Sequence, residues 1–178
     1  MKRDINSNGY IFLYSTILVV IVAVLLTTAA LWLQPYQQRN KENEKCVMIL
    51  SAAGVGEDGK IEFVDGELPV YLVNGNITVL PMKGNGLWGP IWGYLAIAPD
   101  GQTVIGVTFD HKSETPGLGG EITTEKFQSQ FAGKQIMENG CVKPVEFDAI
   151  SGATRTSNGV KEMIDKTIQQ YQPYFAKR

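Results

Sequence analysis

The sequence has few of the side chains that bind metals or form disulfides. Among its 178 residues there are two cysteines, Cys46 and Cys141, and one histidine, His111. Zinc knuckles, cysteine-bound iron–sulfur clusters and disulfide frameworks need more cysteines, and many metal sites need a second imidazole. We therefore predict no metal site, and we interpret both cysteines as small core residues.

Excess charge of either sign is also lacking, since 16 basic and 18 acidic residues give a formal net charge of −2. A protein that binds nucleic acid regardless of sequence needs a basic surface, so no nucleic-acid partner is predicted. The glycine-rich loop at 111–121 has neither the phosphate-binding spacing GxxxxGK[ST] nor GxGxxG after a strand. Without an NADH fingerprint the chain is not a self-contained dehydrogenase, and we assign no catalytic residue.

Hydrophobic residues are concentrated near the N-terminus, where no residue from Tyr10 to Leu33 carries a charge. A helix of this length measures about 36 Å and can cross a hydrocarbon core of about 30 Å. The alternative is a cleaved secretory signal that begins at Lys2 and Arg3, but the apolar run exceeds the usual length of about 15 residues. We predict a retained membrane helix that Pro35 helps to end.

The chain therefore divides into four predicted parts. These are an N-terminal tail at 1–9, a transmembrane helix at 10–33, a juxtamembrane stalk or helix extension at 34–45 and one domain at 46–178. Basic residues lie near both ends of the apolar run, so the positive-inside rule does not decide the orientation.

The domain reads as strands joined by tight turns, with a few helices. The turns are predicted at Asp65-Gly66, Asn74-Gly75 and Pro99-Asp100-Gly101. Strands are predicted at 61–64, 69–73, 77–80, 91–98, 103–109 and 145–150, and helices at 123–131 and 158–171, the last ended by Pro173. Strands in hairpins with flanking helices make an α+β domain with a mostly antiparallel sheet.

Two glycine-rich segments have compositions unusual for simple connections. In 84–93, four glycines surround two tryptophans, which suits a planar ring ligand or, alternatively, a bulged edge strand with core tryptophans. In 111–121, Pro116 and three glycines fix a backbone course whose amides suit an acceptor-rich ligand. His111 reads more readily as a surface or capping residue than as a base, and Glu114 and Glu121 as solvated or paired.

A third segment, 148–159, joins a predicted strand to a predicted helix with Ser157 or Asn158 as its N-cap. The free amides of a helix start favour a phosphate, and Arg155 and the hydroxyls of Thr154 and Thr156 offer further donors. An ordinary capped helix start in a Ser/Thr-rich turn explains the same composition.

The third segment resembles the flavinylation motif of the FMN-binding domain family. The matching residues are Asp148-x-x-Ser151-Gly152-Ala153-Thr154, and in that family the last threonine carries FMN through a phosphoester bond. Gly86-Leu87-Trp88 and the run from Glu114 to Gly119 match the family in the same order. With its apolar helix, the whole chain is similar to the C subunits of Na⁺-translocating NADH:quinone reductases. The G subunits of Rnf-type ferredoxin:NAD⁺ reductases are the alternative, which Gly119-Gly120-Glu121-Ile122 disfavours.

The resemblance implies a role for each matching residue. Thr154 would be the covalent tether of FMN, and Asp148 part of what a flavin transferase reads. The remaining cofactor-binding residues implied are Ser151, Gly152, Ala153, Thr156 and Ser157 around the phosphate, Leu87 and Trp88 beside the ring, and Thr115, Gly117, Leu118 and Gly119 as close backbone contacts.

The resemblance also implies an electron relay in a complex of several subunits that couples NADH oxidation and quinone reduction to Na⁺ translocation. The expected partners are the other membrane subunits and the flavin transferase. The expected location is the bacterial inner membrane, crossed once, with the domain on the periplasmic side. A membrane-anchored binding module without redox chemistry and a purely structural subunit stay open, although neither accounts for the SGAT turn.

Overall fold

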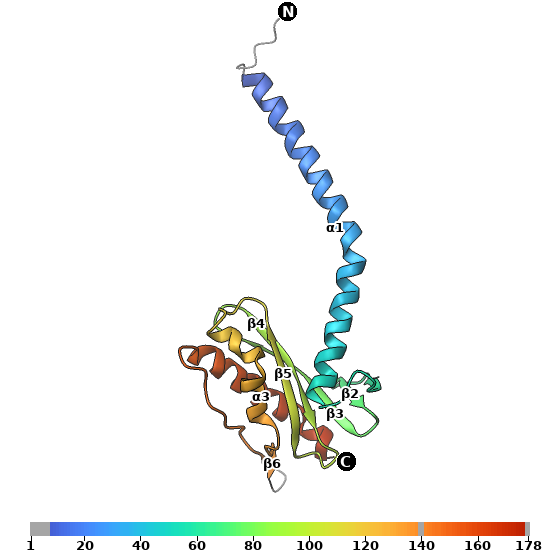
Figure 1. The fold of residues 1–178 in the computed structure, drawn as a ribbon, viewed down its shortest axis with the longest axis vertical. Coiled ribbons are helices and arrows are strands. Elements are labelled where there is room, and N and C mark those ends of the chain that lie inside the picture. Colours follow the sequence, from blue (N-terminus) through green and yellow to red (C-terminus); the bar gives the residue numbers. More distant parts are fainter. Residues whose placement is uncertain (1–7, 139–140, 177–178) are drawn as a thin grey trace, which may run out of the picture. The chain divides into compact units, whose positions relative to one another are not determined.

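The computed structural model describes residues 8–138 and 141–176, so most of the predicted N-terminal tail at 1–9 lies outside the described residues. The chain divides into two units, one that ends at Glu44 and one that begins at Lys45. Helix α1 (Asn8–Ala52) passes from the first unit into the second (Figure 1). Within the described residues, α1 is the one helix long and apolar enough to cross a membrane.

The prediction that Pro35 helps to end the apolar helix is wrong. Helix α1 is 45 residues long and contains Pro35 in its interior. A proline removes one backbone N–H and crowds the preceding turn, but it need not end a helix whose other residues favour one. The stretch after Pro35 is rich in Gln, Glu, Lys and Arg, which are good helix formers. The juxtamembrane segment is therefore a helix extension.

The centre of the second unit is an antiparallel sheet of five strands in the order β1-β2-β3-β4-β5. The strands are β1 (Ile61–Val64), β2 (Val70–Val73), β3 (Ile77–Asn85), β4 (Pro90–Ile97) and β5 (Val104–His111). The first five predicted strands and their hairpins are confirmed. At the β2–β3 turn, Asn74 and Gly75 both have positive φ (53° and 74°), as the tightest hairpins require. A short pair, β6 (Met137–Glu138) and β7 (Cys141–Val142), lies outside this sheet.

The predicted helix at 123–131 is broken into short pieces. They are η1 (Gly119–Thr123), α2 (Glu125–Gln128) and η2 (Ser129–Phe131). Thr124 ends η1 with an extended backbone (φ −78°, ψ 145°), so no continuous helix passes through it.

Helix α3 (Thr154–Ala176) begins four residues before the predicted start and contains Pro173 in its last turns. Ser157 and Asn158 are therefore not its N-cap. The buried face was predicted correctly, since the side chains of Val160, Met163, Ile164, Ile168 and Tyr171 are all buried.

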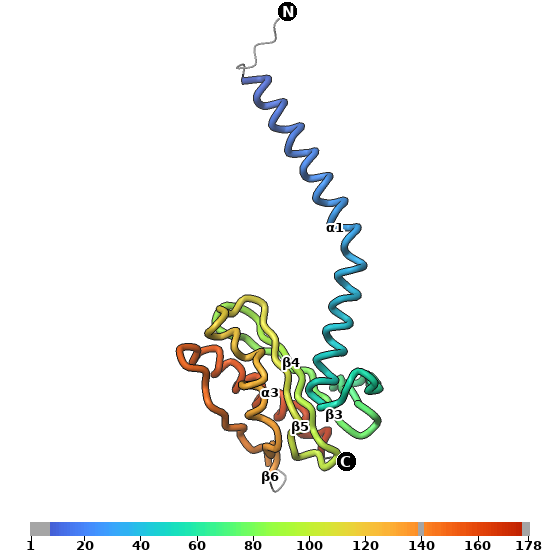
Figure 2. Tube along the Cα trace, in the orientation of Figure 1, coloured from blue at the N-terminus to red at the C-terminus, as the bar shows by residue number. Residues whose placement is uncertain are grey.

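The predicted strand at 145–150 is not a strand. Its backbone is extended but pairs with no strand among the described residues. Val145 and Phe147 alternate with polar residues, and Ile150 follows three residues later; all three pack on the core, and such a pattern resembles that of a sheet face. Figure 2 shows this stretch as the orange trace that leads to the start of α3.

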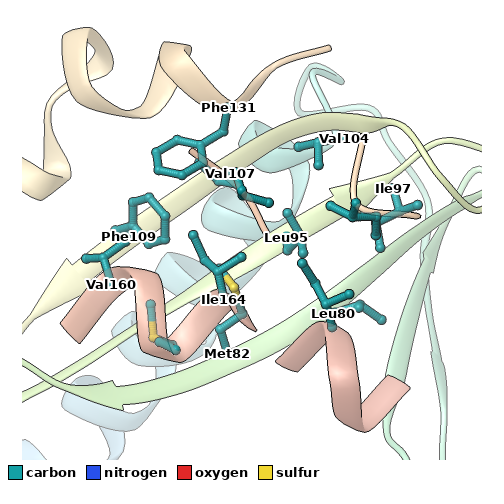
Figure 3. Packing of buried hydrophobic residues seen from close by; sticks show 14 of the residues in the cluster. Leu80, Met82, Leu95, Ile97, Val104, Val107, Phe109, Phe131, Val160 and Ile164 are labelled. Carbon is teal, nitrogen blue, oxygen red and sulfur yellow. The ribbon is translucent and has the colours of Figure 1, made fainter. Parts of the chain in front are cut away.

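The two faces of the sheet are covered by different helices. Helix α3 packs on one face, where Leu80, Met82 and Leu95 meet Val160 and Ile164 (Figure 3). The other face contacts Ile49, Leu50 and Ala52 at the end of α1, and Ala53 directly after it. Val79 and Leu80 are adjacent in β3 and lie in the two different clusters, as alternation along a strand requires. Cys46 and Cys141 are both exposed, so their prediction as core residues is wrong.

Candidate functional site

Three loops meet at the carboxylate of Glu114, whose residue is only 4% exposed. Its Oε1 accepts a hydrogen bond from the backbone N–H of Trp88 at 2.8 Å. Its Oε2 accepts one from the hydroxyl of Thr156 at 2.7 Å. The backbone N–H of Glu114 donates to Nδ1 of His111 at 3.2 Å. One buried side chain thus ties the β3–β4 turn, the loop after β5 and the first turn of α3 together.

Glycines provide the space that this carboxylate occupies. A Cβ at Gly86 would lie 2.4 Å from Oε1 of Glu114, and one at Gly119 would lie 2.3 Å from Oε2. At distances this short, a side chain at either position would require the carboxylate of Glu114 to move. Gly86 lies in the segment 84–93, and Gly119 lies in the segment 111–121. A glycine at each position leaves room for the buried carboxylate of Glu114.

A second contact joins the loop after β5 to the turn before α3. Gly152 has a positive φ of 77°, and a Cβ there would lie 3.0 Å from Cδ2 of Leu118. The side chain of Leu118 therefore reaches the SGAT turn. Leu118 is also 42% exposed. At the β3–β4 turn, Leu87 is 43% exposed and Trp88 is 67% exposed. Exposed large apolar side chains on loops tied to one another are typical of a binding surface. Trp88 is not a core residue of a bulged strand.

The first turn of α3 places backbone N–H donors next to the exposed residue Thr154. Ala153 accepts the first bond of the helix, from the N–H of Ser157 at 3.0 Å, and has no side-chain oxygen with which to cap the helix. The N–H groups of residues 154–156 precede the first intrahelical donor and point away from the helix. Thr154 is exposed at this position. The helix start therefore suits an anion.

Thr156 and Ser157 are both buried, and their hydroxyls are already used. Thr156 donates to Glu114, and Ser157 donates to the carbonyl of Ala153 at 3.1 Å. The Ser157 hydroxyl also accepts the N–H of Ile150 at 3.1 Å. Since a hydroxyl has one proton, neither can donate to a phosphate while these bonds hold. In this arrangement both hydroxyls shape the turn, and their predicted place around the phosphate stays a prediction.

The remaining predicted residues fall into two groups. The first group lies in the loops that are joined through Glu114 and Leu118. Its exposed members are Ser151, Gly152, Thr115 and Gly117, and its buried members are Ala153 and Gly119. The carbonyl of Thr115 accepts N–H bonds from Leu118 (3.1 Å) and Gly120 (3.0 Å), which fixes the tight course of that loop. Asp148 is exposed and bonds to Gln130 instead, outside the Glu114 group.

Known proteins resemble this chain in sequence and in structure. The model of the FMN-binding domain family matches residues 86–169, which include all the loops described above. The C subunit of the Na⁺-translocating NADH-quinone reductase from Pasteurella multocida is 42% identical over 127 residues, covering 61% of this chain and 49% of the relative. The crystal structure of the same subunit from Parabacteroides distasonis superposes with a TM-score of 0.71 at 30% identity, covering 80% of this chain and 96% of that one.

The chain belongs to the family of C subunits of Na⁺-translocating NADH-quinone reductases. The Vibrio anguillarum member is 27% identical, with 89% of this chain and 90% of the relative covered. A Shewanella oneidensis member shares the fold at a TM-score of 0.64 and 22% identity. The chain spans 49% and 40% of the length of the first curated relatives that it matches.

Glu114 is the site residue whose part the sequence did not reveal, because acidic residues are seldom buried. The one signal in the sequence was an acid inside a Gly/Pro-rich loop, but its partners at positions 88 and 156 are far away along the chain. The fold brings these positions together.

Proposed function

We propose that this chain is a membrane-anchored flavoprotein subunit in which FMN is bound covalently through Thr154. The observation that carries the proposal is the exposed Thr154 at the first residue of α3, after an Ala153 that has no side-chain oxygen for a cap, within the motif Asp148-x-x-Ser-Gly-Ala-Thr. The subunit would relay electrons within a complex that couples NADH oxidation and quinone reduction to Na⁺ translocation. Membership of the family of C subunits supports that assignment.

The residues present suit FMN at both of its ends. The phosphate, esterified to Thr154, would lie at the free N–H groups of residues 154–156, where the helix dipole favours negative charge. The planar ring system would lie against the exposed side chains of Leu87, Trp88 and Leu118. Gly117 has a φ of 75°, and no described atom lies within 4 Å of where its Cβ would be, so its side of the loop is open for close approach.

Formation of the tether is a phosphoryl-type transfer that needs an activated donor. The hydroxyl oxygen of Thr154 would form the new P–O bond to the flavin-side phosphorus of a flavin dinucleotide. The pyrophosphate P–O bond would break, and the nucleoside monophosphate would leave with the electron pair. The threonine proton would pass to a base on the transferase. No oxidation or reduction occurs in this step, and Thr154 takes no part in later electron transfer.

FMN, when bound, supplies one- and two-electron redox chemistry. The chain's own residues tune and protect that chemistry. Glu114 fixes the positions of the Trp88 and α3 segments relative to each other, and the apolar side chains of Leu87 and Leu118 exclude water from the ring face. A covalent tether prevents loss of the carrier between successive electron transfers.

We also propose that Tyr10–Leu33 within α1 crosses the bacterial inner membrane once, with the domain on the periplasmic side. The apolar length of α1 supports the crossing, and the periplasmic side is what the resemblance implies. Protease added to intact spheroplasts should then digest the domain. Protection of the domain until the membrane is lysed would contradict this orientation.

The test of the flavoprotein assignment is co-expression with a flavin transferase, followed by denaturing electrophoresis. A flavin-fluorescent band at the mass of this chain is expected, because a covalent tether survives denaturation. A colourless chain despite a competent transferase would instead favour a binding module or structural subunit without flavin.

A further inference from the structure

The motif residue Asp148 is held by a contact that no sequence pattern indicates. Gln130, in η2, uses its side-chain amide to bond both polar groups of the Asp148 backbone. Its Oε1 accepts the Asp148 N–H at 2.8 Å, and its Nε2 donates to the Asp148 carbonyl at 3.4 Å. In an antiparallel sheet a residue of the neighbouring strand exchanges the same pair of bonds. Gln130 thus replaces the missing strand partner of this extended segment at one position.

The neighbouring residues fix which way the segment faces. Phe147 packs in the aromatic cluster, with ring centroids 4.9 Å from Phe131 and 5.5 Å from Phe127. Val145 is buried, two residues earlier. Asp148 directly follows Phe147, which packs in the core, and its own side chain lies on the outer side. Asp148 is accordingly exposed.

The segment forms the wall between two hollows in the surface. A cavity of about 540 Å³ is lined by the segment together with Ser157, Asn158 and Lys161. A second cavity of about 460 Å³ is lined by the segment together with Glu121, Thr124 and Lys126. Gln130, Asp148 and Ala149 line both cavities. We call this segment, with a hollow on either side, the ridge. A protein that binds over the ridge can contact its backbone and the outward side chain of Asp148 together.

We propose that Gln130 is a positioning residue for flavinylation, which holds Asp148 on this ridge in the arrangement that the flavin transferase reads. The inference rests on the proposed function of Thr154. Gln130 takes no part in the bond changes, in which the Thr154 P–O bond forms and the pyrophosphate bond of the flavin dinucleotide breaks. Its role is to present the ridge, while the Ser157 hydroxyl holds the rest of the motif by accepting the N–H of Ile150 and donating to the carbonyl of Ala153.

The role predicts that binding to the transferase changes while the chemical step does not. Gln130→Leu keeps the bulk of the side chain and removes both bonds. It should raise the transferase KM for this chain about five- to tenfold, because the pair of hydrogen bonds that orders Asp148 is lost. The kcat should stay within about twofold of the value for the unsubstituted chain. Gln130→Glu still accepts the Asp148 N–H at the shorter contact, so its KM should rise no more than about threefold.

Gln128 supplies a matched control, because its amide lies two residues away and donates to the carbonyls of Phe109 (3.4 Å) and Ile122 (3.3 Å) rather than to the motif. Gln128→Leu should lower the thermal unfolding temperature at least as much as Gln130→Leu while leaving KM unchanged. A general loss of stability would affect transfer to both variants alike.

The experiment uses the full chain in detergent with purified transferase and flavin adenine dinucleotide, and follows the flavin mass addition by intact-mass spectrometry. A raised KM for Gln130→Leu, partial recovery in Gln130→Glu and a normal KM for Gln128→Leu are the expected results. Wild-type KM in Gln130→Leu, or an equal increase in Gln128→Leu, overturns the role of Gln130 and leaves the flavin assignment intact. Absence of transfer to the unsubstituted chain overturns the flavin assignment itself, and the role of Gln130 with it.

Discussion

Removal of the Glu114 carboxylate should separate the three loops that it joins. Glu114→Ala leaves the Trp88 N–H and the buried Thr156 hydroxyl without their acceptor. Each hydrogen bond to a charged group contributes about 1.5–3 kcal/mol, and part of this is offset because a carboxylate is no longer desolvated. We expect the free energy of unfolding to fall by about 2–4 kcal/mol. Glu114→Gln keeps the size and one acceptor oxygen, so it should cost only about 1 kcal/mol.

The glycines around the carboxylate allow a stricter test of the same geometry. A Cβ at Gly86 would lie 2.4 Å from Oε1 of Glu114, and the next nearest side chain is Ile91, 3.1 Å away. Gly86→Ala should therefore be strongly destabilising alone but much less so in the Glu114→Ala background. We expect the double variant to be more stable than the sum of the single effects by about 1–2 kcal/mol. Gly66→Ala, where no described atom lies within 4 Å, is the control and should add independently.

The measurement is urea unfolding of the full chain in detergent, followed by tryptophan fluorescence and extrapolated linearly to zero denaturant. A loss of stability in Glu114→Ala no larger than that in Glu114→Gln would contradict the bridging role of this carboxylate. Additive effects of Gly86→Ala and Glu114→Ala would contradict it too, because Gly86 would then not be accommodating the carboxylate.

Three further predictions concern α3 and the exposed tryptophan. Burial raises the pKa of Asp165, and its Oδ1 has no hydrogen-bond partner among the described residues. Because its pKa is raised, the folded protein holds the Asp165 proton more tightly than the unfolded chain does. This contribution to the free energy of unfolding is fully present below the ordinary aspartate pKa, and it is lost as the pH rises through the raised pKa. Asp165→Asn should therefore unfold at a higher temperature than the parent at pH 7 and at the same temperature near about pH 3. Gly159→Ala would place a Cβ 2.2 Å from the carbonyl oxygen of Asn85, so calorimetry should show a melting temperature about 5–10 °C lower, and an unchanged value would mean that α3 does not pack this closely on β3. Trp88→Ala should leave FMN attached but shift its visible absorption bands, whereas an unchanged spectrum would remove Trp88 from the ring site.

Local signals in the sequence were enough to predict the sheet. Asn74-Gly75 dictates a tight turn by its backbone preferences alone, and the strands on either side pair in register from it. The buried face of α3 likewise follows from spacing. Pro35 and Pro173 misled the helix boundaries because a proline lowers the stability of a helix without always ending it.

The candidate site was predictable in its parts but not in its assembly. The segments containing Trp88, Leu118 and Thr154 were singled out by composition and by resemblance. Their connection through Glu114 depends on tertiary contacts between residues 26 and 42 positions apart, which periodicity cannot reveal. The segment at 145–150 was mistaken for a strand because the hydrophobic pattern reports only which residues are buried. It does not reveal whether the backbone bonds to a neighbouring strand or to the side chain of Gln130.

The central claim is that the hydroxyl of Thr154 carries FMN. The most direct measurement is mass spectrometry of a peptide spanning Asp148–Lys161 from chain that was co-expressed with a flavin transferase and purified under denaturing conditions. Thr154→Val removes the hydroxyl and keeps the branched side chain at an exposed position, so the chain should fold and carry no flavin. Thr156→Ser keeps the hydroxyl that bonds to Glu114 and should carry the full flavin mass on Thr154. A flavin mass that persists in Thr154→Val, or that maps to residue 156 in the unsubstituted chain, would contradict the claim.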